Sequence, residues 1–253
     1  MAGMIIFCVG ALLEALVLLR GYQQKLLREF PCFYAYLLFV ALDDLARLSV
    51  YRWVPDQYVA FYWITQYVAL ALGAGVVIEV YRVALRPFPG VARLARTVLL
   101  IVFFGVFSQT IVMSSGDVWT RMATSALAVE RNLRIAQVAA ILSLVSLFRW
   151  YAVPFGRNLK GILLGYGTFV GLSSLQFILW YFRWEPVTRY WQTTEPFVYL
   201  LVLLLWAAAL WSYQPAPQLS PENRFAQDYQ LVVASTRAQF RRTLARLGWA
   251  VRA

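Results

Sequence analysis

The stretch FYAYLLFVALDDLARLSV, residues 33–50, is apolar enough to cross a membrane except for Asp43, Asp44 and Arg47. A helix needs about 20 predominantly apolar residues to span the hydrocarbon core of a bilayer. A charged side chain at the bilayer centre costs about 2.5 to 3.5 kcal/mol on insertion scales. The stretch therefore predicts a transmembrane helix whose three charges are compensated elsewhere in the fold.

Six further apolar stretches accompany this one along the 253 residues of the chain. Hydrophobic residues make up 61% of the sequence and charged residues 14%, and the mean hydropathy is +0.62, which excludes an ordinary soluble domain. The long, continuous apolar runs favour helices over the short alternating strands of outer-membrane barrels. We predict an all-α, polytopic membrane protein, a seven-transmembrane-helix bundle over residues 1–213. Its predicted spans are 4–20, 33–50, 58–81, 97–114, 130–150, 161–182 and 195–213.

The distribution of Lys and Arg predicts how this bundle is oriented, because basic residues accumulate in cytoplasmic connections. The second, fourth and sixth connections hold only Arg52, Arg121, Arg183 and Arg189. The basic residues of the first, third and fifth connections are Arg20, Lys25, Arg28, Arg82, Arg86, Arg93, Arg96, Arg149, Arg157 and Lys160. We therefore expect the N-terminus outside and the C-terminus in the cytoplasm, with the net charge of +11 facing anionic lipid rather than nucleic acid.

The chain after the last predicted span is polar and basic. Residues 214–221 form a Pro-rich linker, and Ser220 and Pro221 resemble the start of a helix. We expect 222–253 to form a cytoplasmic amphipathic basic helix on the inner leaflet, with a docking helix for a protein partner as the alternative. The residues expected at the membrane surface are Arg237, Phe240, Arg241, Arg242, Leu244, Arg246 and Leu247.

Several cofactor chemistries are excluded by residue content. The chain has no histidine, the commonest ligand for haem, zinc and copper and the usual general base. Its only lysines, Lys25 and Lys160, lie in connections, so no last-helix lysine is present to hold retinal. DDLAR at 43–47 has Arg47 where a DDxxD magnesium motif needs an acid. We therefore expect no cofactor, no metal and no enzymatic activity.

A second cluster of charges, VERNLRIAQ at 129–137, complements the first. Its helix is expected to run opposite to residues 33–50, so Arg134 would lie near Asp43 and Asp44 while Glu130 meets Arg47. Glu14 lies at a similar depth in the first span, about ten residues in at 1.5 Å per residue. The predicted intramembrane charge network is Glu14, Asp43, Asp44, Arg47, Glu130, Arg131 and Arg134.

Polar amides and a hydroxyl lie in the middle or outer half of several spans. They are Gln66, Gln109, Thr110, Gln137 and Gln176. One interpretation is hydrogen bonding between helices, worth about 0.6 kcal/mol per contact. The other is a polar cavity for a ligand or ion, since ionisable groups inside a membrane mark functional sites by default.

Glycines and prolines predict how the helices pack. GILLGYGTFVG at 161–171 contains two small-xxx-small pairs, which indicate close approach to a neighbouring helix or, alternatively, a homo-oligomer face. The residues of this predicted packing face are Gly161, Gly165, Gly167 and Gly171. All ten prolines lie between the spans or in a span's first turn, so we expect unbroken helices. Unbroken helices count against transporters whose sites are built from broken ones.

Three segments carry a resemblance to a known group of proteins: LREFPCFYAYLLF at 27–39, YWITQYVALALG at 62–73 and YRVALRPFPGVARLAR at 81–96. Together they resemble a family of uncharacterised bacterial seven-helix membrane proteins. The resemblance implies a seven-helix bundle in the bacterial cytoplasmic (inner) membrane. It implies no activity and no site residues.

Three functions are compatible with these features. The first is a non-catalytic inner-membrane subunit, scaffold or sensor that works through protein partners or as a homo-oligomer, in contact with anionic lipid. The alternative is a transporter or channel for a small solute or protons that uses the intramembrane carboxylates. An enzyme acting on lipid is third.

Overall fold

The computed structural model describes the backbone of residues 2–112, 118–151, 153–181, 185–215, 227–235 and 238. Side chains are described over the same ranges except at 2–4, 109–112, 118–127, 180–181 and 185–193. Over these residues the protein is helical and contains no strand, which confirms the all-α prediction.

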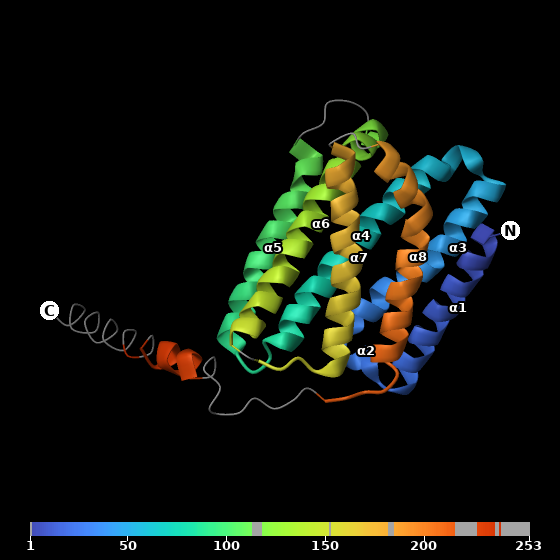
Figure 1. Cartoon of the computed structure of the whole chain (residues 1–253). Coiled ribbons are helices and arrows are strands. Elements are labelled where there is room, and N and C mark those ends of the chain that lie inside the picture. The colour runs from blue at the N-terminus through green and yellow to red at the C-terminus, as the bar shows by residue number, and fades with distance from the viewer. Residues whose placement is uncertain are drawn as a thin grey trace.

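Seven long helices, of 22 to 33 residues each, make up most of the described chain (Figure 1). Each of the seven apolar stretches lies largely within one of them. A short α2 (Leu26–Glu29) precedes α3, and a 3-10 turn η1 (Pro55–Gln57) precedes α4. The long helices are α1 (Ala2–Gln23), α3 (Pro31–Trp53), α4 (Tyr58–Ala84), α5 (Pro89–Val112), α6 (Val118–Trp150), α7 (Arg157–Tyr181) and α8 (Glu185–Ala209).

Five segments within the described residues are long and apolar enough to cross a membrane. They are Ile5–Gln23, Pro55–Ala84, Pro89–Ser108, Ala128–Trp150 and Arg157–Leu179. Helix α3 is not among them because Asp43, Asp44 and Arg47 interrupt its apolar run. In α8 the apolar part, Thr194–Ala209, is shorter than the five. A membrane protein follows from this length and composition, whereas seven spans remain a prediction.

Helix α4 occupies the middle of the bundle and packs against α3, α5, α6 and α7. Helix α1 packs on α8 and α3, and α7 packs on α8 and α6, so the bundle continues around both sides of α4 (Figure 1). The core is aliphatic and aromatic: Phe33, Leu37, Val77 and Ile162 are completely buried, as is Trp206. Phe33 and Trp206 meet edge to face at 4.9 Å between ring centroids and join α3 to α8.

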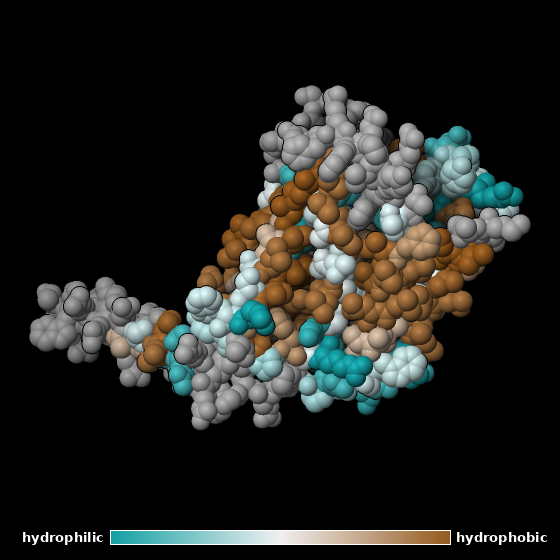
Figure 2. All heavy atoms as spheres, viewed as in Figure 1, coloured by the Kyte–Doolittle hydropathy of each residue, from teal (hydrophilic) through white to brown (hydrophobic). Residues whose placement is uncertain are grey.

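Basic residues gather at the end of the bundle where α1, α4, α6 and α8 finish and α3, α5 and α7 begin. We call this the basic end; hydrophilic atoms surround it at the bottom of Figure 2, below a broad hydrophobic band. Its described basic residues are Arg20, Lys25, Arg28, Arg82, Arg86, Arg93, Arg149, Arg157 and Lys160.

Two helix ends at the basic end are capped by side chains from other helices. The backbone N–H groups of Cys32 and Phe33, in the first turn of α3, each donate to the Glu79 carboxylate of α4 at 2.9 Å. The Asn158 amide donates to the carbonyls of Ala209 and Ser212 at 3.0 and 2.9 Å, where α8 finishes. Both contacts satisfy backbone groups that a helix terminus leaves without intrahelical partners.

The expectation that every proline lies outside the helices or in a first turn is wrong for Pro196. Helix α8 begins at Glu185, ten residues before the predicted start of the span, so Pro196 lies in its interior. A proline has no backbone N–H to donate, and its ring crowds the preceding turn. The predicted unbroken ladder of hydrogen bonds is therefore interrupted in α8.

Candidate functional site

A cavity of about 430 Å³ lies inside the bundle among α3, α4, α6, α7 and α8. We call it the chamber. Its wall is polar on several sides, although it lies among helices that are otherwise apolar. The polar and aromatic residues that line it are Tyr36, Asp43, Asp44, Arg47, Tyr62, Gln66, Glu130, Arg134, Gln137, Tyr166, Phe169, Glu195 and Tyr199.

Arg47 is held in the chamber by contacts from its own helix and from α4. Its guanidinium forms an ion pair with Asp43 one turn earlier, with 2.7 Å between Nη2 and Oδ2. It donates to the Thr65 hydroxyl at 2.9 and 3.2 Å and lies 4.4 Å from the centre of the Tyr62 ring. A longer hydrogen bond of 3.4 Å reaches the Gln66 side chain. These partners offset the cost of placing a guanidinium among apolar helices.

A second ion pair faces the chamber from α6. Arg134 donates from Nε and Nη2 to Glu130 Oε1 at 2.9 and 2.6 Å. Its guanidinium also lies 5.5 Å from the centre of the Phe169 ring on α7. Both side chains are largely buried, with 14% of Arg134 and 11% of Glu130 exposed. This pair, like the first, joins residues four apart on one helix.

No salt bridge among the described residues joins the two clusters, so the predicted direct pairing between them is not observed. Arg134 pairs with Glu130 instead of Asp43 and Asp44, and Arg47 pairs with Asp43 instead of Glu130. The physical reason is the position of α4, which packs against both α3 and α6 where the prediction had placed those two helices side by side. The two clusters do line one cavity, so they face each other across the chamber.

Two carboxylates of the chamber lack an ion-pair partner within the described part of the chain: Asp44 on α3 and Glu195 on α8. Asp43 Oδ1 is also buried with no hydrogen-bond partner among the described atoms. Four carboxylates, at Asp43, Asp44, Glu130 and Glu195, face two guanidinium groups, a formal charge of −2. The chamber is therefore acidic after both of its arginines are neutralised.

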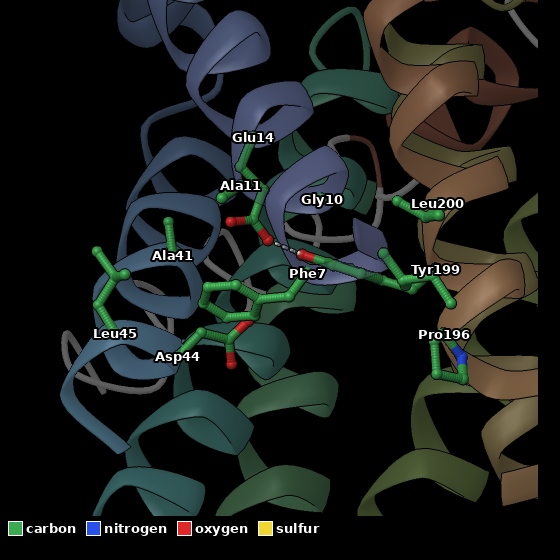
Figure 3. A pocket seen from close by; sticks show the side chains of 11 residues that line it. Phe7, Gly10, Ala11, Glu14, Ala41, Asp44, Leu45, Pro196, Tyr199 and Leu200 are labelled. Atoms are coloured by element: carbon green, nitrogen blue, oxygen red, sulfur yellow. Dashed lines mark hydrogen bonds between the residues drawn. The ribbon is translucent and has the colours of Figure 1, made fainter. Parts of the chain in front are cut away.

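Glu14 lies beside the chamber rather than in it. The Tyr199 hydroxyl of α8 donates to its carboxylate at 2.5 Å, which links α8 to α1 (Figure 3). Glu14 is only 3% exposed. It lines a second cavity of about 290 Å³, which shares Asp44, Pro196 and Tyr199 with the chamber.

Other residues of the predicted network lie elsewhere. Arg131 is exposed on α6 and contacts Asn132, because one residue of helix turns it about 100° from Glu130. It is therefore not part of the buried charge network. Among the predicted polar residues, Gln66 and Gln137 line the chamber, whereas Gln176 on α7 does not. The side chains of Gln109 and Thr110 lie outside the described residues.

The glycines of α7 divide between two neighbours. A Cβ added at Gly161 would overlap Ala209 of α8, and one added at Gly165 would overlap the Trp206 indole. At Gly167 an added Cβ would lie 3.3 Å from Ile141 of α6. Gly171 has open space around it. The first three glycines therefore allow close packing inside the bundle.

The tail residues from Arg237 to Leu247 that were expected at the membrane surface lie outside the described residues. A helical segment over 227–235 is described, and it reaches back to the basic end. The rings of Tyr229 and Phe88 meet edge to face at 5.2 Å, and the Gly90 N–H donates to the Tyr229 hydroxyl at 3.4 Å.

Sequence reasoning missed Glu195, Glu79 and the tyrosines that line the chamber. Glu195 is the first residue of the predicted last span, 195–213, and nothing in the local sequence singles it out as a site residue. Glu79 is a lone acid near the end of a span, and its low exposure of 2% comes from packing against the start of α3. Tyr36 and Tyr166 meet edge to face at 5.7 Å inside the bundle, which a high aromatic content does not reveal.

Within the described residues no group of three or more acidic or sulfur side chains is placed to hold a metal ion. Comparison of the chain with protein-family models, with curated proteins and with solved structures found no match.

Proposed function

We propose that this chain binds a small cationic solute in the chamber and carries it across a membrane. The observation that carries the proposal is the pair Asp44 and Glu195, which line the chamber and form no salt bridge among the described residues. Intramembrane ionisable groups are costly and usually mark ion or substrate pathways. Of the functions compatible with the sequence, a solute transporter uses these carboxylates most directly.

The chemistry of the wall favours a cation over an anion. Both arginines that line the chamber are paired with carboxylates, so an anion would find no free guanidinium there among the described residues. A cation would instead offset the formal charge of −2. Tyrosine rings at Tyr36, Tyr166 and Tyr199 add π faces, and ammonium groups bind such faces with about 0.5 to 2 kcal/mol.

Pro196 supports movement in the same region. It lines the chamber from the interior of α8, where the helix lacks one backbone hydrogen bond. Sharp bends in helices occur mostly at such positions. A bend of α8 at Pro196 would move Glu195 and Tyr199 relative to α3, and alternate exposure of a bound solute requires a movement of this kind.

The proposal includes the number of membrane spans, their orientation and the membrane that holds them. Seven spans fit the seven long helices, with α3 and α8 crossing beside the five more apolar segments because their charges face the chamber. The basic end then lies in the cytoplasm and the N-terminus outside. The resemblance of three segments to bacterial seven-helix membrane proteins supports the cytoplasmic (inner) membrane of a bacterium.

Equilibrium binding of radiolabelled tetramethylammonium to the full chain in nanodiscs tests this function. We expect saturable binding that falls at least tenfold in Asp44→Asn and in Glu195→Gln. Glu29→Gln is the matched control, because Glu29 pairs with Arg86 at the basic end, away from the chamber. Absence of saturable binding, or equal loss in the control, would contradict the proposal. Uptake into proteoliposomes then separates a carrier from a protein that only binds.

The tail favours a second function, a non-catalytic subunit or sensor that acts through protein partners. In the segment 227–235, Leu231 and Val232 are 69% and 62% exposed while Tyr229 contacts the α4–α5 connection. A basic amphipathic helix over 222–253 would lie on anionic lipid or on a partner. Native mass spectrometry of protein released gently from its own membrane tests this alternative. Co-released polypeptides support a subunit, and release without them supports the carrier.

A further inference from the structure

A second cavity, which we call the side pocket, adjoins the chamber between α1, α3 and α8. Its volume is about 290 Å³. Phe7 of α1, Ala41 and Leu45 of α3 and Leu200 of α8 line it (Figure 3). The remaining apolar wall consists of Ile6, Gly10 and Ala11 of α1 and Pro196 of α8. The side pocket is therefore mostly hydrocarbon, in contrast to the chamber.

The two cavities meet at shared residues. Asp44, Pro196 and Tyr199 line both of them. Asp44 is at the junction, and it is one of the two chamber carboxylates without an ion-pair partner among the described residues. A molecule bound at Asp44 could thus contact the polar chamber and the apolar side pocket at once.

The side pocket lies next to the outer surface of the bundle. Leu45, which lines it, is 51% exposed, and Leu42 on the same helix is 57% exposed. Leu12 of α1 is 71% exposed, and the surface of this part of the bundle is hydrophobic. In a membrane-spanning bundle such a surface is covered by lipid chains, so the pocket rim is apolar toward the bilayer.

We propose that the side pocket holds the hydrocarbon chain of an amphiphile whose cationic head binds in the chamber. This inference rests on the proposed function and specifies its substrate class. An amphiphile satisfies both cavities, because the wall of the side pocket is mostly apolar apart from Glu14, Asp44 and Tyr199, whereas charged and polar side chains make up much of the wall of the chamber. The chamber, at about 430 Å³, lies within the range of about 300 to 1,000 Å³ usual for ligand sites, and the side pocket adds about 290 Å³ to it.

The hydrogen bond between Tyr199 and Glu14 helps to keep the side pocket apolar and the chamber polar. Glu14 is the second carboxylate in the wall of the side pocket, and its hydrogen bond to Tyr199 satisfies it within the protein. Because the same tyrosine lines the chamber, the bond also holds α1 and α8 together at the junction. The rest of the side pocket is then free to contact a chain.

Two radiolabelled probes test the proposal on the full chain in nanodiscs: tetramethylammonium, which is a head alone, and decyltrimethylammonium, which adds a chain. Binding of the second probe to empty nanodiscs is subtracted. Gly10→Leu fills the side pocket; an added Cβ there lies 3.8 Å from Leu200, an ordinary contact that the backbone tolerates. Gly105→Leu is the matched control, because Gly105 is exposed on α5 with nothing within 4 Å of an added Cβ.

We expect Gly10→Leu to weaken decyltrimethylammonium binding at least tenfold and to change tetramethylammonium binding less than twofold. Gly105→Leu should change neither, and Asp44→Asn should weaken both. Ala41→Leu fills the side pocket from α3 and should repeat the result of Gly10→Leu, which guards against a folding defect in one variant.

The outcomes distinguish this inference from the proposed function. Unchanged decyltrimethylammonium binding in Gly10→Leu and Ala41→Leu, with tetramethylammonium still bound, overturns the side-pocket proposal and leaves the cation site standing. Equal loss of both probes in both variants also overturns it, because the two cavities would not then act separately. Failure of the unaltered chain to bind either probe overturns both proposals.

Discussion

The basic end and the chamber both bury carboxylates among apolar helices, but these carboxylates differ in their hydrogen-bond and ion-pair partners. At the basic end both oxygens of Glu79 accept backbone N–H groups from the first turn of α3, each at 2.9 Å. In the chamber Asp44 and Glu195 line a cavity and form no salt bridge among the described residues. A buried acid whose acceptors are filled is a structural part of the fold. One that faces a cavity without a partner is available to a ligand.

The ion pairs of the chamber provide the largest expected effect on stability. Arg134→Met removes the partner of Glu130 and leaves a buried carboxylate uncompensated, which we expect to cost about 3 to 5 kcal/mol of unfolding free energy. Adding Glu130→Gln should recover most of the loss. Thermal unfolding of the single and double variants in detergent measures the loss and its recovery. If the effects of the two substitutions simply add in the double variant, Glu130 and Arg134 are not coupled.

Glu79→Ala should have the next largest effect. It leaves two N–H groups of α3 without acceptors, at about 1 to 3 kcal/mol each when buried, so we expect a loss of about 3 kcal/mol. Glu79→Gln retains one acceptor oxygen and should lose about half as much. The same unfolding measurement applies, and the variant that remains folded should bind tetramethylammonium normally. If Glu79→Ala leaves the free energy of unfolding unchanged, Glu79 does not have the structural role assigned to it.

Asp44→Asn should change stability in the opposite direction. Neutralising an unpaired intramembrane acid removes a cost, so we expect a gain of about 1 to 2 kcal/mol together with the loss of cation binding. If Asp44→Asn has a higher melting temperature and no longer binds the cation, Asp44 has a binding role, unlike the structural Glu79 at the basic end. Lower stability would instead assign Asp44 to the structural group with Glu79.

Glu29→Gln should have the smallest effect. Its partner Arg86 is 76% exposed, and exposed ion pairs contribute about 0 to 1 kcal/mol. Thermal unfolding at low and high salt should barely distinguish the variant from the unaltered chain. If Glu29→Gln lost as much unfolding free energy as Glu79→Ala, burial would not explain why Glu79 matters more to stability than Glu29.

The sequence was enough to predict which charged residues share one face of a helix. It was not enough to predict which helices lie next to each other. Asp43 and Arg47, like Glu130 and Arg134, are four apart on a helix, and residues four apart lie on one face whatever the surroundings. The predicted salt bridges across two helices are not observed among the described residues, and α4 packs against both α3 and α6. The helix that lies beside another is chosen by packing, as at Gly165 and Trp206, and not by any single charge.

Glu195 and Pro196 show why the candidate site was only partly predictable. Both fall at the edge of an apolar run, so hydropathy alone treats them as the start of a span. Helix α8 begins ten residues earlier, at Glu185, which carries both side chains into the bundle. The acid that brings the formal charge of the chamber from −1 to −2 was therefore missed, although Asp43, Asp44 and Arg47 had pointed to an intramembrane site.

The sequence by itself determined the class of protein, the places of the long helices and the existence of buried charge, because apolar length and the cost of a charge in lipid are local properties. Only the tertiary structure decided which charges remain unpaired, which glycines meet a neighbour, and that a polar chamber adjoins an apolar side pocket. Those features depend on which helices pack together, and packing follows from the shapes and volumes of side chains far apart in the chain.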